Sequence, residues 1–318
     1  MPVSRVLVRD PEDGFDESPE LACMSDLIQD TRRVLWLDIQ DPTARDLELL
    51  RQEFGFHELA LEDVARRSQR AKIDRYDGYC FIVFFAVRPG RYDEIGLFIG
   101  PNYLVTVHVG DVAEITETAM RWHRNADRLG HGVGVPLYSL LDAIVDGYFP
   151  RIDEIAERIE AIEQVLFEPD GRPELQDVLA LKRELLELRR VLAPEREVLN
   201  VLLRRDEPFI REANLVYFQD IYDHIIRVLE SVDLYRDQLS GLLDAQLAVV
   251  SNRLNVTVKR MTALATVLMS VNLIASNYGM NFETMPELQW EIGYPYALGL
   301  MVAVGVILTV IFKRIDWL

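Results

Sequence analysis

Cysteine and histidine are scarce in this chain of 318 residues. Only Cys23 and Cys80 occur, which excludes a disulfide framework and a zinc site built from cysteines. The five histidines never fall four residues apart. The sequence also lacks the phosphate-binding G-x-x-x-x-G-K-[ST] loop, the G-x-S-x-G nucleophile elbow and the H-E-x-x-H metal motif. We therefore expect a protein that is not an enzyme.

Positive charge is also in short supply. The chain has 34 Lys and Arg against 52 Asp and Glu, a formal net charge of -18. Because nucleic-acid binding needs a basic surface, we expect no nucleic-acid partner. An acidic surface instead favours cations or basic partners. A hydrophobic fraction of 49% is enough for a sizeable core and excludes global disorder.

Charged residues disappear from two segments near the C-terminal end, residues 261–278 and 294–312. A helix of about 20 apolar residues crosses the hydrocarbon core of a bilayer. We interpret the segments as two membrane-spanning helices over 261–280 and 294–312, joined by an external loop over 281–293. A pair of buried core helices is the alternative.

The flanking charges predict an orientation. Lys and Arg precede the first span, as at Lys259 and Arg260, and follow the second, at Lys313 and Arg314. The loop between the spans contains acids but no Lys or Arg. The positive-inside rule places both termini, including the tail 313–318, on the cytoplasmic side of the cell (inner) membrane.

The two spans differ in polarity. Past its tyrosines, the second has Thr309 as its only polar residue, whereas the first carries several hydroxyl and amide side chains. Such groups usually face a bundle interior or a water-filled path, although hydroxyls also hold helices together. Asn272 favours the water-filled path. Since two spans cannot enclose a pore, conduction would require a cyclic homo-oligomer lined by the first span.

The remaining sequence predicts an α+β protein, with an α/β cytoplasmic domain over residues 1–135 and a helical hairpin and stalk helix over 136–260. Thr43 is the expected cap of one helix in the first domain. Gly130–Gly134 lacks the full G-x-G-x-x-G and is interpreted as a hinge. Runs of β-branched and aromatic residues predict strands, and apolar residues at helical spacing predict helices. The expected strands are 34–39, 71–76, 79–87, 94–99 and 103–109, and the expected helices are 43–54, 57–67 and 113–128.

From Pro136 onward the pattern is helical. We expect a helix over 136–166 with a bend at Pro150, and another over 173–203 with a break at Pro194. Residues 208–278 contain one internal glycine, Gly241, and as one helix would span about 105 Å. Two helices that separate near Gly241 are the alternative. A spacing of three to four residues predicts a helix assembly through Phe218, Tyr222, Ile225, Leu229, Val232, Leu239, Leu243 and Val250.

The loop after the first span begins Gly279-Met280-Asn281 and continues with M-P-E-L at 285–288. It resembles the signature of the CorA family of magnesium channels. W-L-D at 36–38, H-E-L-A-L-E-D at 57–63 and S-G-L-L-D at 240–244 are similar to the family's N-terminal domain and stalk, so the resemblance covers essentially the whole chain. It implies a funnel-shaped homopentamer in a lipid bilayer that takes up hydrated Mg²⁺, and also Co²⁺ or Ni²⁺.

The resemblance also implies roles for particular residues. Magnesium loses its water reluctantly, so the neutral amide of Asn281 would bind the hydrated ion through its waters. Gly279 would let the chain turn tightly at the helix end. The entrance residues are then Gly279, Met280 and Asn281, with the acids Glu283, Glu287 and Glu291 concentrating cations. The implied pore-lining residues are Asn255, Val258, Met261, Ala265, Met269, Asn272 and Ser276, the methionines forming a hydrophobic constriction.

Members of this family use cytoplasmic acids at subunit interfaces to sense magnesium. The matching residues here are Asp220 and His224 on the stalk, Glu157 and Glu160 on the preceding hairpin, and Asp93 or Glu94 in a loop between strands. Magnesium would thus be both transported and regulatory, with no organic cofactor. A zinc transporter of a related branch and a non-conducting, membrane-anchored sensor of divalent cations stay open as alternatives.

Overall fold

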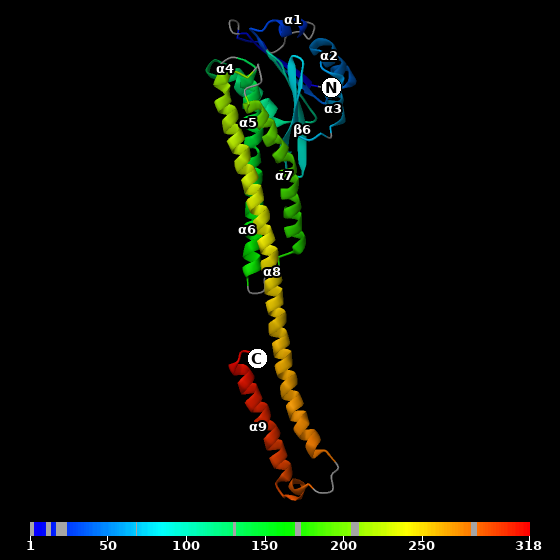
Figure 1. Ribbon diagram of the computed structural model, residues 1–318, viewed down its shortest axis with the longest axis vertical. Coiled ribbons are helices and arrows are strands. Elements are labelled where there is room, and N and C mark those ends of the chain that lie inside the picture. Colours follow the sequence, from blue (N-terminus) through cyan, green and yellow to red (C-terminus); the bar gives the residue numbers. More distant parts are fainter. Residues whose placement is uncertain are drawn as a thin grey trace. The chain divides into compact units, whose positions relative to one another are not determined.

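The computed structural model describes residues 3–10, 14–16, 24–67, 69–129, 132–168, 173–204, 210–280 and 285–318. The chain divides into two compact units, Met1–Leu239 and Ser240–Leu318. The first contains a sheet and a set of helices, and the second contains two apolar helices (Figure 1).

A seven-stranded mixed sheet forms the centre of the first unit. Its strand order is β2-β1-β3-β7-β6-β5-β4. β3 and β7 pair in parallel, and the other neighbours pair antiparallel. The strands are β1 (Val3–Asp10), β2 (Gly14–Asp16), β3 (Val34–Gln40), β4 (Lys72–Tyr76), β5 (Tyr79–Arg88), β6 (Arg91–Ile99) and β7 (Tyr103–His108).

Helices cover both faces of this sheet, which explains its long apolar strands. On one face lie α2 (Ala44–Phe54) and α3 (Glu58–Arg66), with Phe56 stacked on Phe98 at 4.1 Å between ring centres. On the other face, α4 (Ala113–Leu129) places Trp122 against Trp36 at 5.9 Å. Strands buried on both faces consist of near-continuous hydrophobic runs, as β5 does.

The structure confirms the five predicted strands and three predicted helices, with small shifts at their ends. Thr43 caps α2 in a reciprocal capping box with Asp46. The largest shift is in β6, which starts at Arg91 because Pro89 and Gly90 form a tight turn with Gly90 at φ 75°. β1, β2 and α1 (Met24–Gln29) were not expected from the sequence.

The predicted bend at Pro150 is wrong. The helix ends at Gly147, which separates α5 (Gly134–Asp146) from α6 (Tyr148–Phe167). Pro150 lies in the first turn of α6, where a backbone N–H has no partner inside the helix in any case. The predicted hinge partly lies outside the described residues, and Gly134 already belongs to α5.

The predicted break at Pro194 is also wrong, because α7 (Leu175–Leu203) continues through it. Proline inside a helix costs about 3 kcal/mol. Buried leucines on both sides, such as Leu188 and Leu199, hold α7 against the rest of the unit and outweigh this cost. α7 contacts β4 and β5, so tertiary packing decides the outcome.

One helix, α8 (Leu215–Tyr278), runs for 64 residues and passes through Gly241 without a break. It follows a short 3₁₀ turn, η2 (Glu212–Asn214). Its apolar face is buried from Phe218 to Leu239, but Val250 is 58% exposed. The predicted packing face therefore ends at Leu239 within this chain.

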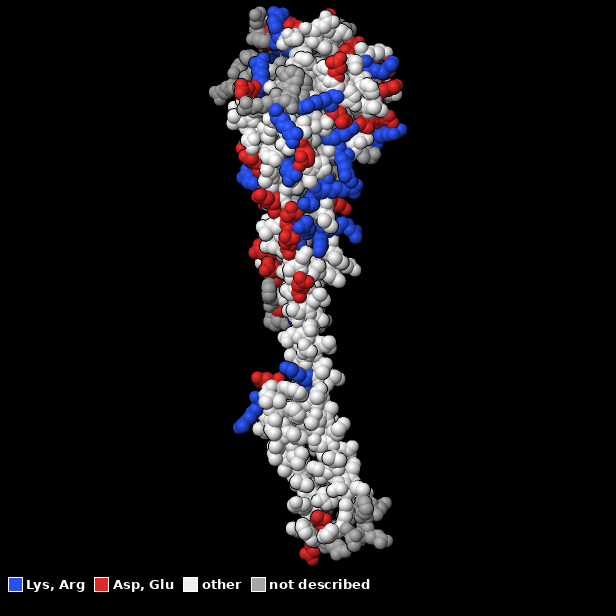
Figure 2. Space-filling view, in the orientation of Figure 1, with Lys and Arg blue, Asp and Glu red and all other residues white. Residues whose placement is uncertain are grey.

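The second unit contains the end of α8 and α9 (Gly293–Arg314), connected through η3 (Pro286–Gln289). Both helices are long and apolar enough to cross a membrane, and only 6% of each apolar window is buried. Figure 2 shows an almost uncharged surface over these helices, in contrast to the charged first unit.

Candidate functional site

The membrane-spanning part of α8 has one face against α9. Ala263 is fully buried there, and Val267, Ser270 and Val271 are half-buried. Gly305 of α9 lies on this face, since a Cβ at this position would be at an ordinary contact distance of 3.7 Å from the Val271 side chain. This face of α8 is occupied within the chain.

The opposite face of α8 is unoccupied by α9. Two residues of α8, Ala265 and Met269, each lie two positions from Val267. A helix turns about 100° per residue, so both face roughly away from Val267. Met269 is 72% exposed and Met261 is 68% exposed. All seven residues of the predicted pore face are exposed in the single chain, namely Asn255, Val258, Met261, Ala265, Met269, Asn272 and Ser276.

The polar side chains of this span fall into two groups. Thr266 donates its hydroxyl to the carbonyl of Thr262, and Ser270 donates to that of Thr266, both at 2.8 Å. Both hydroxyls are satisfied by their own helix, so neither needs a partner from water or another chain. Among the described residues, none forms a hydrogen bond with the side chain of Asn272. Its side-chain amide therefore needs water or another chain as a partner.

The entrance motif is only partly described. Asn281 and Glu283 lie outside the described residues. Gly279 ends the helix by donating its N–H to the carbonyl of Ala275 at 3.0 Å, without the positive φ of the expected tight turn. A side chain there would still be crowded, since a Cβ would lie 3.3 Å from that carbonyl. Met280 is 47% exposed.

The described end of the loop folds back on the start of α9. Glu287 lies half-buried in η3, and Glu291 is exposed. A Cβ on Gly293 would lie 2.3 Å from the carbonyl oxygen of Glu287, so only glycine fits there. This close contact holds Glu287 next to the first turn of α9.

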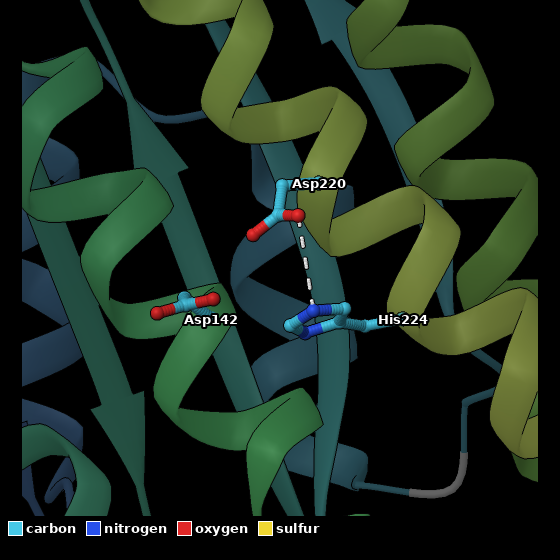
Figure 3. Close-up of side chains that lie close together, drawn as sticks. All are labelled: Asp142, Asp220 and His224. Atoms are coloured by element: carbon cyan, nitrogen blue, oxygen red, sulfur yellow. Dashed lines mark ion pairs between the residues drawn. The ribbon is translucent and has the colours of Figure 1, made fainter.

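One group of acids and histidine in the first unit could hold a metal ion. Among the described residues, Asp142 of α5 and Asp220 and His224 of α8 place a ligand atom each within 4.8 Å of one another (Figure 3). His224 Nε2 lies 3.8 Å from Asp220 Oδ1. His224 Nδ1 lies 3.3 Å from Asp146 Oδ1 without the alignment of a hydrogen bond. Two carboxylates and an imidazole form a plausible ligand set for a divalent cation.

The electrostatics of this cluster favour a cation. Burial is the main cause that raises the pKa of Asp142, followed by the Asp146 carboxylate. His224 lowers this pKa, Asp220 raises it by a smaller amount, and Arg121 has the smallest, lowering effect. A raised pKa means that the protein stabilises the ionised carboxylate less well than water does. A divalent cation bound between Asp142 and Asp220 would reverse this imbalance.

The other predicted regulatory acids do not join the cluster. Glu157 and Glu160 are exposed on α6. The expectation that Asp93 and Glu94 lie in a loop is wrong, since both belong to β6. Asp93 already lies 3.1 Å from Arg91, so its charge is compensated, and burial raises the pKa of Glu94.

Sequence reasoning missed Asp142. A signal was present, because Asp142 and Asp146 stand four residues apart on a helix with ten buried residues. Side chains at this spacing share one helix face. Two carboxylates on the face of a largely buried helix need a cation or hydrogen-bond donors nearby to balance their charge.

Comparison with known proteins gives the family. Residues 32–314 match the family described as CorA-like Mg2+ transporter protein. The chain belongs to the CorA family. The cobalt/magnesium transport protein CorA of Thermotoga maritima is 36% identical over 91% of this chain and 85% of its own length.

A CorA protein of Methanocaldococcus jannaschii is 24% identical over 96% of this chain and 98% of its own length. The complete structure of CorA magnesium transporter from that organism matches with a TM-score of 0.82 at 22% identity, covering 98% of each chain. The structure of the full-length CmaX protein matches with a TM-score of 0.75 at 19% identity, covering 99% of this chain and 98% of that one. The α/β unit, the long helix and the two C-terminal apolar helices thus form a CorA fold.

Proposed function

We propose that this chain forms a channel-like homo-oligomer that takes up Mg²⁺ across the cell membrane, with α8 lining the pore. The observation that carries the proposal is the division of α8 into two faces. One face packs on α9, and the opposite face leaves seven residues of the predicted pore exposed, with Asn272 lacking a protein partner among the described residues.

Assembly is supported by the stretch of α8 that follows Leu239. Among the described residues, Leu247 is 68% exposed and Leu254 is 62% exposed. Apolar side chains at helical spacing pack stably against equivalent helices of further copies. Membership of the CorA family favours a homopentamer with both termini in the cytoplasm.

Selectivity in this proposal belongs to the Gly279-Met280-Asn281 loop. A ring of Asn281 amides would bind magnesium through its waters, because this ion retains its hydration shell. Glu287 and Glu291 are the described acids near the loop and would attract cations without dehydrating them.

Regulation is assigned to the cluster of Asp142, Asp220 and His224. Asp220 is 68% exposed on its side chain, which leaves the cluster open to ligands from another copy. A magnesium ion bound there would stabilise the closed arrangement of subunits if it binds that arrangement more tightly than the open one. Loss of intracellular magnesium would then shift the population towards the open state.

The test is ion flux into liposomes that contain the purified full-length protein and an internal magnesium dye. We expect flux in the wild type, and no flux with Asn281→Ala in oligomers of unchanged size. Thr309→Val is the matched control, because the Thr309 hydroxyl bonds to its own helix at Gly305. Flux retained by Asn281→Ala would contradict the selectivity role, and flux of Zn²⁺ but not Mg²⁺ would favour zinc transport.

A further inference from the structure

One carboxyl group in the first unit is completely enclosed. Glu195 of α7 follows Pro194 and has no exposed surface. No ion pair among the described residues includes Glu195, and its pKa is affected only by burial, Tyr148 and Phe85. An ionised carboxylate without a cation is costly in such a place. The contacts of this side chain show how the cost is avoided.

Glu195 takes part in a closed ring of three contacts. The N–H of Phe85 in β5 donates to Glu195 Oε1 at 2.8 Å. The other oxygen, Oε2, lies 2.8 Å from the hydroxyl oxygen of Tyr148 in α6. That hydroxyl oxygen lies 2.6 Å from the carbonyl oxygen of Phe85. The ring therefore connects α7, α6 and β5.

The protons of the ring can be counted. A tyrosine hydroxyl carries one proton, and a carbonyl oxygen can only accept. The shorter contact, from Tyr148 to the Phe85 carbonyl, uses the tyrosine proton. The contact between Tyr148 and Glu195 Oε2 then needs a second proton, which only the carboxyl group can supply. This second proton is present when Glu195 is neutral, and the carboxyl group then accepts from Phe85 and donates to Tyr148.

The ring lies at an edge of the sheet. β4 pairs with β5 only from Tyr79 to Val83, so Phe85 lies beyond the end of β4. The backbone N–H and C=O of Phe85 bond to Glu195 and Tyr148 as they would to a further strand. The two side chains thereby fasten the hairpin of α6 and α7 to β5.

Among the described residues, no charged side chain contributes to the raised pKa of Glu195. Four cations on β5, β4, α6 and α7 have carboxylate partners of their own. The pairs are Arg88–Glu114, Lys72–Asp63, Arg151–Glu184 and Arg196–Glu197. Glu114 also acts on Tyr148, whose pKa is raised well above its usual value mainly by burial.

We propose that Glu195 is a proton-operated latch, which holds the α6–α7 hairpin on β5 when neutral and releases it when the proton is lost. The latch is a regulatory device for the first unit, and rising pH weakens it up to the pH at which Glu195 is ionised in both states. All three residues lie in the first unit, and none of them belongs to the proposed pore, entrance or metal cluster.

The direction of the pH dependence follows from linkage. Burial raises the pKa of Glu195 to about 8, from an ordinary value of 4.5. In the released state the carboxyl group ionises at its ordinary pKa. Release is therefore favoured as pH rises from about 4.5 to 8, by about tenfold per pH unit, and levels off above pH 8.

Hydrogen exchange of the full-length protein in lipid nanodiscs tests the latch. In Glu195→Gln the amide oxygen accepts from Phe85 and the amide NH₂ donates to Tyr148, so the ring is kept without a titrating proton. Exchange of the peptide 79–88, corrected for the chemical exchange rate, should rise about tenfold per pH unit between pH 6 and 8 in the wild type. It should stay level in Glu195→Gln, and an equal rise in both proteins would overturn the proposal.

Infrared spectroscopy gives a second test that does not depend on the glutamine variant. The wild type should show a carboxylic-acid C=O band at pH 6 that disappears with a midpoint near pH 8. Tyr148→Phe should move this band to higher frequency, since the acid proton loses its acceptor. Glu197→Gln, at the exposed neighbouring position, should leave the band unchanged. Absence of such a band in the wild type would show an ionised Glu195 and overturn the latch.

Discussion

The two parts of α8 that lie on either side of Leu239 behave differently. Before Leu239, one face is buried by the same chain, with Ile225 and Val232 fully enclosed. After it, Leu247, Val250 and Leu254 are more than half exposed until Ala263 meets α9. One continuous helix is thus a buried core helix of the first unit and then an exposed apolar helix.

Truncation of a buried and an exposed residue of α8 should separate these roles most strongly. Ile225→Ala should lower the free energy of unfolding of the first unit by about 2–5 kcal/mol, because it leaves a cavity in a closed core. Leu254→Ala should leave that transition within about 0.5 kcal/mol and instead weaken the oligomer. Calorimetry and light scattering of the full-length protein measure the two effects. An equal loss of unfolding free energy in both variants would contradict the division at Leu239.

Within the membrane, the two groups of polar side chains should differ in the same way. Asn272→Leu should reduce magnesium flux more than about tenfold, since a rise of about 1.4 kcal/mol in the barrier suffices. Thr266→Val should leave flux within twofold, because its hydroxyl bonds only to its own helix. Liposome flux assays compare the variants, and unchanged flux in Asn272→Leu would remove Asn272 from the pore.

The metal cluster of the first unit should give an intermediate effect. Magnesium at 100 times its dissociation constant should stabilise the wild type by about 2.7 kcal/mol. Asp142→Asn should lose most of this stabilisation, whereas Asp153→Asn, on the exposed face of α6, should keep it. Thermal unfolding with and without magnesium measures the difference.

The pKa of Asp142 sets the pH dependence of that stabilisation. Because the pKa is raised in the folded protein, its protonated form is favoured and competes with magnesium as pH falls. The magnesium-induced shift of the melting temperature should therefore shrink from pH 7.5 to pH 5. Asp142→Asn should remove this part of the pH dependence, and an equal pH dependence in both proteins would show that Asp142 does not bind the ion.

The smallest effect is expected at the boundary between the two parts. A Cβ at Gly241 meets nothing within 4 Å, and the helix is regular there. Gly241→Ala should therefore stabilise α8 by about 0.5–1 kcal/mol. Denaturant unfolding of the full-length protein checks this, and destabilisation would indicate that another chain occupies the open space.

Periodicity of apolar residues predicted the local elements but not the consequences of packing. The strand β5 and the cap at Thr43 depend on neighbouring residues and were predictable. Pro194 was misjudged because buried leucines from distant contacts decide whether α7 continues. Asp142 was missed for the same reason, since its pairing with Asp220 and His224 joins residues about eighty positions apart. The position of Asn281 stays a prediction from sequence.

The sheet of the first unit ends in two short edge strands, β2 with three residues and β4 with five. Short edges discourage the strand-to-strand joining that leads proteins to aggregate. Beyond β4, the longer β5 would offer unpaired backbone groups at Phe85, but Glu195 and Tyr148 already bond to them. The edge of the sheet at Phe85 therefore offers no free backbone group with which a further strand could pair.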